Sequence, residues 1–150
     1  MQVLGRLMDG NIALADLKGI AKKKLFQMAE AGYTKFKYGR LEEAKEIFLA
    51  LSRLDHRNYY YHAVLGGIHQ KQKNFIDAIV QYTLALRLQS KDTASLVNRG
   101  EIYLRHKNYR KAAEDFRAAI LLDTTGRNLW ANRARSLVIA IKRSMDLKKK

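Results

Sequence analysis

The chain contains neither cysteine nor proline. Without cysteine no disulfide bond can form, and the sequence gives no sign of an oxidising or a reducing compartment. Proline is the strongest helix breaker, so its absence is typical of a chain that is helical almost throughout. No stretch approaches the roughly 20 apolar residues that span a bilayer, and residues 1–10 lack the apolar core of a signal peptide. We therefore expect a cytoplasmic protein without a transmembrane segment.

Acidic residues are scarce as well. Lysine and arginine together number 29 against 14 aspartates and glutamates, which leaves a net charge of +15. Such a surface attracts acidic proteins, nucleic acids and anionic lipids without distinguishing among them. The length of 150 residues and the apolar content of 47% suit one soluble domain with a core of its own. We therefore expect a single basic domain.

One 34-residue pattern occurs three times in succession between Leu25 and Gly126. Four columns share this period, and they hold a glycine, a large apolar residue, an alanine and an aromatic residue. The columns are Gly32, Gly66 and Gly100; Leu41, Phe75 and Tyr109; Ala44, Ala78 and Ala112; and Phe48, Tyr82 and Phe116. A fixed period of this length predicts stacked helix hairpins, in which the small residues let two helices approach and the aromatic residues fill the gaps.

The repeats divide the domain into five segments. These are an N-terminal helical segment (1–24), repeat one (25–58), repeat two (59–92), repeat three (93–126), and a C-terminal capping helix with a basic tail (127–150). The N-terminal segment is expected to become ordered against the first repeat or a second subunit. The tail segment carries eight basic residues and one acidic residue.

The turns inside the hairpins carry residues that suit a left-handed backbone. Gly39 should end the first helix of repeat one, with the second helix beginning near Leu41. The matching turns of the later repeats read Lys73-Asn74 and Lys107-Asn108, and asparagine is the next best residue for this conformation. Asp92 and Thr93 are predicted to cap the first helix of repeat three.

The columns resemble those of the tetratricopeptide repeat, including the Leu54-Asp55 ending of the first unit. The chain also resembles the type III secretion chaperones of the translocator proteins, in its three repeats, N-terminal helix and single terminal helix. The segments that carry this second resemblance are residues 10–20 (GNIALADLKGI), residues 33–44 (YTKFKYGRLEEA), Leu51, Asp55 and Gln70. Those chaperones are usually acidic or near neutral, so a charge of +15 departs from their pattern.

This resemblance implies an all-α fold, a right-handed α-solenoid of three helix hairpins with a helix at each end. It further implies a non-catalytic, chaperone-like module that binds an extended peptide segment of a partner in a concave groove lined by the first helices. The implied groove residues are Phe26, Tyr33, Phe36, Lys37, Tyr60, Ala63, Gln70, Lys71, Val97, Glu101, Leu104 and Arg105. Aromatic residues with basic neighbours are good binding anchors. The competing interpretation is that Tyr33 and Phe36 pack on the N-terminal helix.

Two other kinds of partner stay open. Unmatched apolar residues near the two ends, such as Leu14, Leu17, Val138 and Ile139, allow a terminal helix of one copy to dock on another copy. The basic charge together with the aromatic run 59–61 allows nucleic-acid binding. Charge alone is a non-specific signal, so nucleic acid is the less favoured partner.

The sequence carries no pattern typical of an enzyme. It has no phosphate-binding loop, no nucleophile elbow and no HExxH helix. His62 and His69 lie seven residues apart on one helical face, but no cysteine or acidic cluster completes a set of metal ligands around them. We therefore interpret both histidines as core residues, and we expect no catalytic residue, no metal and no cofactor.

Overall fold

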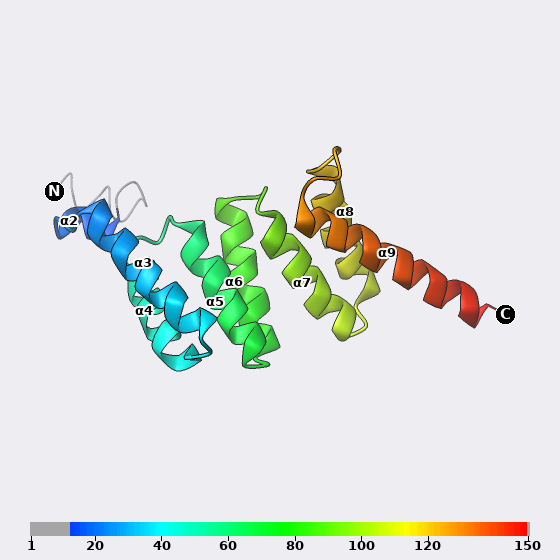
Figure 1. Cartoon of the computed structure of the whole chain (residues 1–150), viewed down its shortest axis with the longest axis horizontal. Coiled ribbons are helices and arrows are strands. Elements are labelled where there is room, and N and C mark those ends of the chain that lie inside the picture. Colours follow the sequence, from blue (N-terminus) through cyan, green and yellow to red (C-terminus); the bar gives the residue numbers. More distant parts are fainter. Residues whose placement is uncertain (1–12, 150) are drawn as a thin grey trace. The chain divides into compact units, whose positions relative to one another are not determined.

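A computed structural model describes residues 13–149, and every regular element in this range is an α-helix (Figure 1). The helices are α2 (Leu14–Leu17), α3 (Lys22–Lys37), α4 (Leu41–Leu54), α5 (Tyr59–Lys71), α6 (Phe75–Leu88), α7 (Thr93–Arg105), α8 (Tyr109–Leu121) and α9 (Leu129–Lys148). The all-α fold of helix hairpins predicted from the period is confirmed. None of these helices is both long enough and apolar enough to cross a bilayer. Of the resemblance segment 10–20, residues 10–12 lie outside the described range.

The helices fall into two compact units, and the boundary in the sequence lies between Leu88 and Gln89. The first unit holds α2 and the hairpins α3–α4 and α5–α6, and the second holds the hairpin α7–α8 and the single helix α9. Each unit has a core of its own. That of the second unit includes Leu96, Val97, Ile102, Ala112, Phe116, Ala119, Ala131 and Ala134.

Each hairpin closes where a glycine of its first helix meets an aromatic ring of its second. A Cβ placed on Gly66 would lie 2.7 Å from the ring of Tyr82, and one placed on Gly100 would lie 2.6 Å from the ring of Phe116. No side chain fits at such distances without moving the ring. The three rings of the aromatic column are almost fully buried: Phe48, Tyr82 and Phe116. The glycine column is therefore a column of close helix contacts.

The short helix α2 packs on the first unit. Ala13 and Ala15 are each 1% exposed, and Ala15 belongs to the same core as the helices α3, α4 and α5. The Asp16 carboxylate accepts a bond from the Arg57 guanidinium at 3.0 Å, which ties the segment to the turn before α5. Of the two surfaces considered for the N-terminal segment, its described part thus lies against the first repeat.

The turns inside the hairpins correct the sequence-based prediction. Lysine takes the left-handed backbone, with φ of 62° at Lys73 and 61° at Lys107, in register with Gly39 at 79°. Asparagine follows as the cap of the next helix: the Asn108 side chain accepts a bond from the backbone N–H of Lys111 at 3.3 Å. A cap residue lies outside the left-handed region, so the residue before it makes the turn.

The predicted cap of α7 is correct only in part. Asp92 occupies the cap position, but its carboxylate accepts a bond from the Ser95 hydroxyl and none from the backbone of α7. Thr93 is the first residue of the helix. The cap residue of α8, Asn108, thus binds the helix backbone through its side chain, whereas the cap residue of α7, Asp92, binds another side chain.

Glycine at either left-handed lysine should stabilise the protein. An L-residue in this conformation is strained by about 1 kcal/mol, so we expect Lys73→Gly and Lys107→Gly each to raise the free energy of unfolding by about 0.5–1 kcal/mol. Urea unfolding measures the change. Lys73→Ala removes the side chain but keeps the strain, and it should leave the midpoint unchanged. A lower midpoint for Lys73→Gly than for Lys73→Ala would contradict this account.

Candidate functional site

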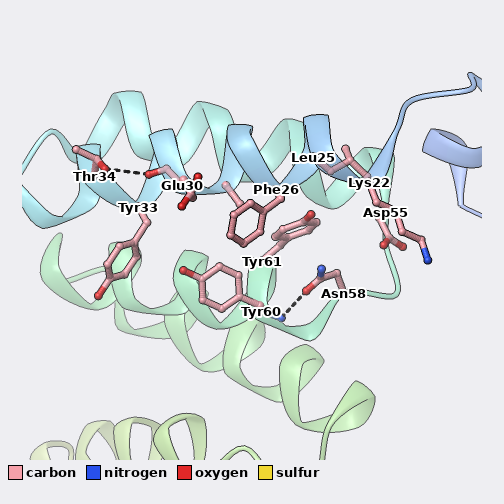
Figure 2. A pocket seen from close by; sticks show the side chains of 11 residues that line it. Lys22, Leu25, Phe26, Glu30, Tyr33, Thr34, Asp55, Asn58, Tyr60 and Tyr61 are labelled. Carbon is pink, nitrogen blue, oxygen red and sulfur yellow. Dashed lines mark hydrogen bonds between the residues drawn. The ribbon is translucent and has the colours of Figure 1, made fainter.

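A cavity of about 640 Å³ lies in the first unit, between α3 and the start of α5 (Figure 2). Its walls are the facing sides of these two first helices, and the chain just before α5 forms one end. The lining residues are Lys22, Leu25, Phe26, Ala29, Glu30, Tyr33, Thr34, Asp55, Asn58, Tyr60 and Tyr61. A mostly apolar cavity with few polar groups is the usual form of a binding site.

Four aromatic side chains point into this cavity from its two sides (Figure 2). Phe26 and Tyr33, seven residues apart on one face of α3, are 63% and 46% exposed, and Tyr60 on α5 is 38% exposed. Tyr61 is buried, and its ring centre lies 6.2 Å from that of Phe48 in the core. The cavity therefore offers three accessible rings beside a buried one that joins the core.

The start of α5 is fixed by a cap. The Asn58 side chain accepts a bond from the backbone N–H of Tyr60 at 3.0 Å, which sets the direction in which the two tyrosines leave the helix. Burial raises the pKa of both phenols, and at Tyr61 the Asp55 carboxylate adds to the effect. Both hydroxyls stay protonated at neutral pH and can donate hydrogen bonds.

Phe36 and Lys71 continue the surface beyond Tyr33. The Phe36 ring centre lies 5.9 Å from that of Tyr33, and the Lys71 ammonium lies 4.5 Å from the Phe36 ring. The ring of Phe36 fills the space above Gly67, where a Cβ would lie 3.3 Å from it. Tyr33 points toward α5 (Figure 2). Both side chains thus contact each other or α5, and Phe36 also packs against the core of the first unit.

The remaining groove residues of the first unit differ in how accessible they are. The Gln70 side chain accepts a hydrogen bond from the Tyr82 hydroxyl at 2.7 Å, so this amide joins the two helices of the α5–α6 hairpin. Lys37 is exposed and Ala63 is half-buried. Neither of these two residues lines the cavity.

The residues expected in repeat three lie in the second unit. Val97 is fully buried, so it cannot touch a ligand in this conformation. The Glu101 carboxylate accepts a bond from the Arg133 guanidinium of α9. Leu104 and Arg105 line a different cavity, beside α9.

An ion pair between α7 and α8 was not predicted from the sequence. The Arg99 guanidinium donates two bonds to the Asp115 carboxylate, at 2.9 and 2.7 Å, and Asp115 is 5% exposed. Repeat two has Leu65 and Gln81 at the matching positions. Two charges of opposite sign in columns that are otherwise uncharged were the signal that could have revealed this pair.

The two histidines of α5 face other helices of the first unit. The Nδ1 atom of His62 lies 2.9 Å from the Gln81 side-chain oxygen, and that of His69 is buried without a hydrogen-bond partner. Among residues 13–149, no group of three or more histidine, aspartate or glutamate side chains is placed to hold a metal ion. Burial is the main cause that lowers the pKa of His69.

His69 should make the stability of the first unit depend on pH. The unfolded chain binds a proton at this residue near the ordinary pKa of 6.5, whereas the folded chain binds it only at lower pH. The folded state is therefore fully favoured above pH 6.5 and loses stability as the pH falls below it. Urea unfolding at pH 7.5, 6.5 and 5.5 should show a larger loss for the wild type than for His69→Gln. The variant of an exposed histidine, His56→Gln, should behave like the wild type, and equal losses in all three proteins would contradict the assignment.

Comparison with known proteins finds similar sequences and similar folds. Residues 94–125 match the tetratricopeptide repeat model. A segment of 64 residues is 39% identical to Superkiller protein 3 of Schizosaccharomyces pombe. It covers 43% of this chain and 5% of that protein, so the chain spans about a twentieth of its curated relative's length.

Two solved structures share the fold over most of the chain. A type III secretion system complex from Aeromonas hydrophila matches with a TM-score of 0.87 and 26% identity, over 97% of both chains. The type III secretion chaperone SycD of Yersinia enterocolitica, in complex with a peptide of the translocator YopD, matches with a TM-score of 0.78 and 24% identity. That match covers 87% of this chain and 98% of the other. Residues 94–125 thus match a tetratricopeptide repeat, and the fold over most of the chain is that of these two structures, as the sequence predicted.

Proposed function

We propose that the chain is a non-catalytic, chaperone-like binding module that holds an extended peptide segment of a partner protein in the cavity between α3 and α5. The observation that carries this proposal is the set of three accessible aromatic side chains, Phe26, Tyr33 and Tyr60, which converge on one cavity from two helices. A contiguous group of exposed rings is the kind of surface that marks a binding site for a partner.

The chemistry of the cavity suits a peptide. Apolar side chains of the ligand would lie among the rings of Phe26, Tyr33 and Tyr60, whereas the tyrosine hydroxyls would donate hydrogen bonds to its backbone carbonyls. Lys22 lines the cavity, and Lys71 lies on the Phe36 ring beyond Tyr33. Glu30 and Asp55 line the same cavity, so its charged groups are of both signs, and the apolar anchors rather than charge select the segment.

The comparisons support a binding role rather than catalysis. SycD, whose fold this chain shares, was solved with a peptide of its translocator. Tetratricopeptide repeats present surfaces to many kinds of partner, so the fold by itself names none. The identity of the peptide must therefore come from an experiment on this chain.

Peptide binding by the full-length protein tests the proposal. Overlapping 20-residue peptides from the proteins encoded beside this chain's gene would be titrated by fluorescence anisotropy, and hydrogen exchange would locate the site. We expect at least one peptide to bind and to protect the amides of α3 and α5. Failure of every peptide to bind, or protection confined to the second unit, would contradict the proposal. A single-stranded RNA of 20 nucleotides that binds more tightly, with a steep salt dependence, would favour the nucleic-acid alternative.

A further inference from the structure

The last helix is longer than its place in the repeat requires. The first helices of the three repeats end in phase, at Lys37, Lys71 and Arg105, which are 34 residues apart. The same phase would end α9 at Ile139, but the helix continues to Lys148. Figure 1 shows its last turns extending beyond the α7–α8 hairpin. Covering the last repeat does not explain this extension, because the buried residues of α9 lie in its first half.

The extension forms one wall of a second cavity, of about 450 Å³, whose other wall is the end of α7 and the turn after it. Three apolar side chains of α9 follow one another along this cavity with a spacing of four residues: Leu137, Ile141 and Met145. Leu104 faces them from α7. A row with this spacing is the ridge that packs against a neighbouring helix. Met145 is nevertheless 56% exposed, so the ridge has room for a further helix.

The charges around this cavity have one sign. Arg105, Lys107 and Lys148 belong to its lining, which includes no acidic residue. The one acidic residue of the segment 127–150, Asp146, is not among the lining side chains. Positive groups beside an apolar ridge are complementary to a helix with one apolar face and carboxylates along its edges.

We propose that this second cavity binds an acidic amphipathic helix of a partner protein. The apolar face of that helix lies on Leu104, Ile141 and Met145, and its carboxylates meet Lys107 and Lys148. This is the helix-in-groove mode of peptide recognition. It differs from the function proposed above in its unit, its residues and the conformation of its ligand.

The shape of the cavity favours a helix over the other acidic partners. A bilayer surface needs apolar side chains that point outward, whereas this ridge faces the turn between α7 and α8. Nucleic acid needs rings on which bases stack, and Tyr109 is the one aromatic residue in the lining. A second copy of the chain carries the same net charge of +15, which opposes its approach.

The test uses the full-length protein and a designed 18-residue peptide with leucines at helical spacing and glutamates on its other faces. We expect it to bind in 100 mM salt, and Met145→Asp to weaken binding at least about tenfold. Lys107→Gln/Lys148→Gln should weaken binding several-fold. Lys142→Gln/Lys149→Gln removes the same charge away from the cavity and should change affinity less than about twofold. Tyr33→Ala, in the other unit, should leave this affinity unchanged.

Several results would overturn the proposal. These are no binding at 1 mM peptide, equal losses in the two double variants, or equal binding of a peptide with glutamine in place of glutamate. Phosphatidylserine vesicles or single-stranded RNA that bind more tightly and depend more on Met145 would assign the surface to those partners. A dimer in light scattering that Met145→Asp dissociates would assign it to a second copy. The two cavities share no residue, so failure of this peptide to bind would overturn the proposal for the second cavity and would not bear on the cavity between α3 and α5.

Discussion

Replacing Asp115 with alanine should destabilise the second unit by about 3–5 kcal/mol, the largest loss of stability that we expect from a single substitution. The two bonds between this carboxylate and the Arg99 guanidinium measure 2.9 and 2.7 Å, and the two side chains are 7% and 18% exposed. Removal of the carboxylate leaves a buried positive charge between α7 and α8 without its main partner. A guanidinium keeps its proton in proteins whatever its neighbours, so Arg99 remains charged in the variant.

The neighbouring repeat supplies the control for this substitution. Repeat two has Leu65 and Gln81 at the positions of Arg99 and Asp115, so Arg99→Leu/Asp115→Gln copies a combination that the same hairpin already tolerates. We expect the double variant to lie within about 1 kcal/mol of the wild type, because a buried ion pair is often no more stabilising than an uncharged replacement.

The single tryptophan makes the measurement specific to the second unit. Trp130 lies in α9, so its fluorescence during urea unfolding reports this unit alone. Arg99→Leu completes the double-mutant cycle. A loss below about 1 kcal/mol for Asp115→Ala, or a double variant no more stable than the single one, would show that the pair does not act as described.

The period predicted the hairpins because it records what all three repeats must satisfy. Each hairpin closes with a glycine against a buried ring, so the columns of Gly66 and Tyr82 recur and reveal the helix pairs. The bounds followed from the same logic, and the second helix expected near Leu41 does begin there. The left-handed conformation of the two lysines was not predicted from the sequence. The cap of the following helix, and not the intrinsic preference of asparagine, decides which residue makes the turn.

The features that belong to one repeat could not be read from the period. The pair of Arg99 and Asp115 and the extension of α9 to Lys148 are departures from the pattern, and only neighbouring side chains show what each departure does. The groove was predicted from family positions, which placed Val97 on the same surface as Tyr33. Val97 is fully buried, and Ala29 at the matching position of repeat one is buried as well, so this column packs inside the repeats.

Removing the accessible rings of the cavity between α3 and α5 should abolish most of its affinity for a peptide that binds there. We expect Tyr33→Ala and Phe26→Ala each to weaken binding by about tenfold, and Tyr33→Ala/Tyr60→Ala by about a hundredfold. These side chains are 38–63% exposed, so the same changes should cost little stability, and the helical circular dichroism signal should persist.

Matched variants separate the contributions of shape, hydrogen bonding and general aromatic content. Tyr33→Phe keeps the ring but not the hydroxyl, so a loss of about threefold would measure the hydrogen bond that the phenol donates. Tyr38→Ala removes a ring that is 76% exposed, just beyond α3 and outside the cavity, and it should leave affinity unchanged. Phe36→Ala tests whether the ring under Lys71 belongs to the same surface. If Tyr38→Ala weakens binding as much as Tyr33→Ala, or if Tyr33→Ala/Tyr60→Ala has no effect, the peptide lies elsewhere. The rings would then need another partner to explain why they are exposed.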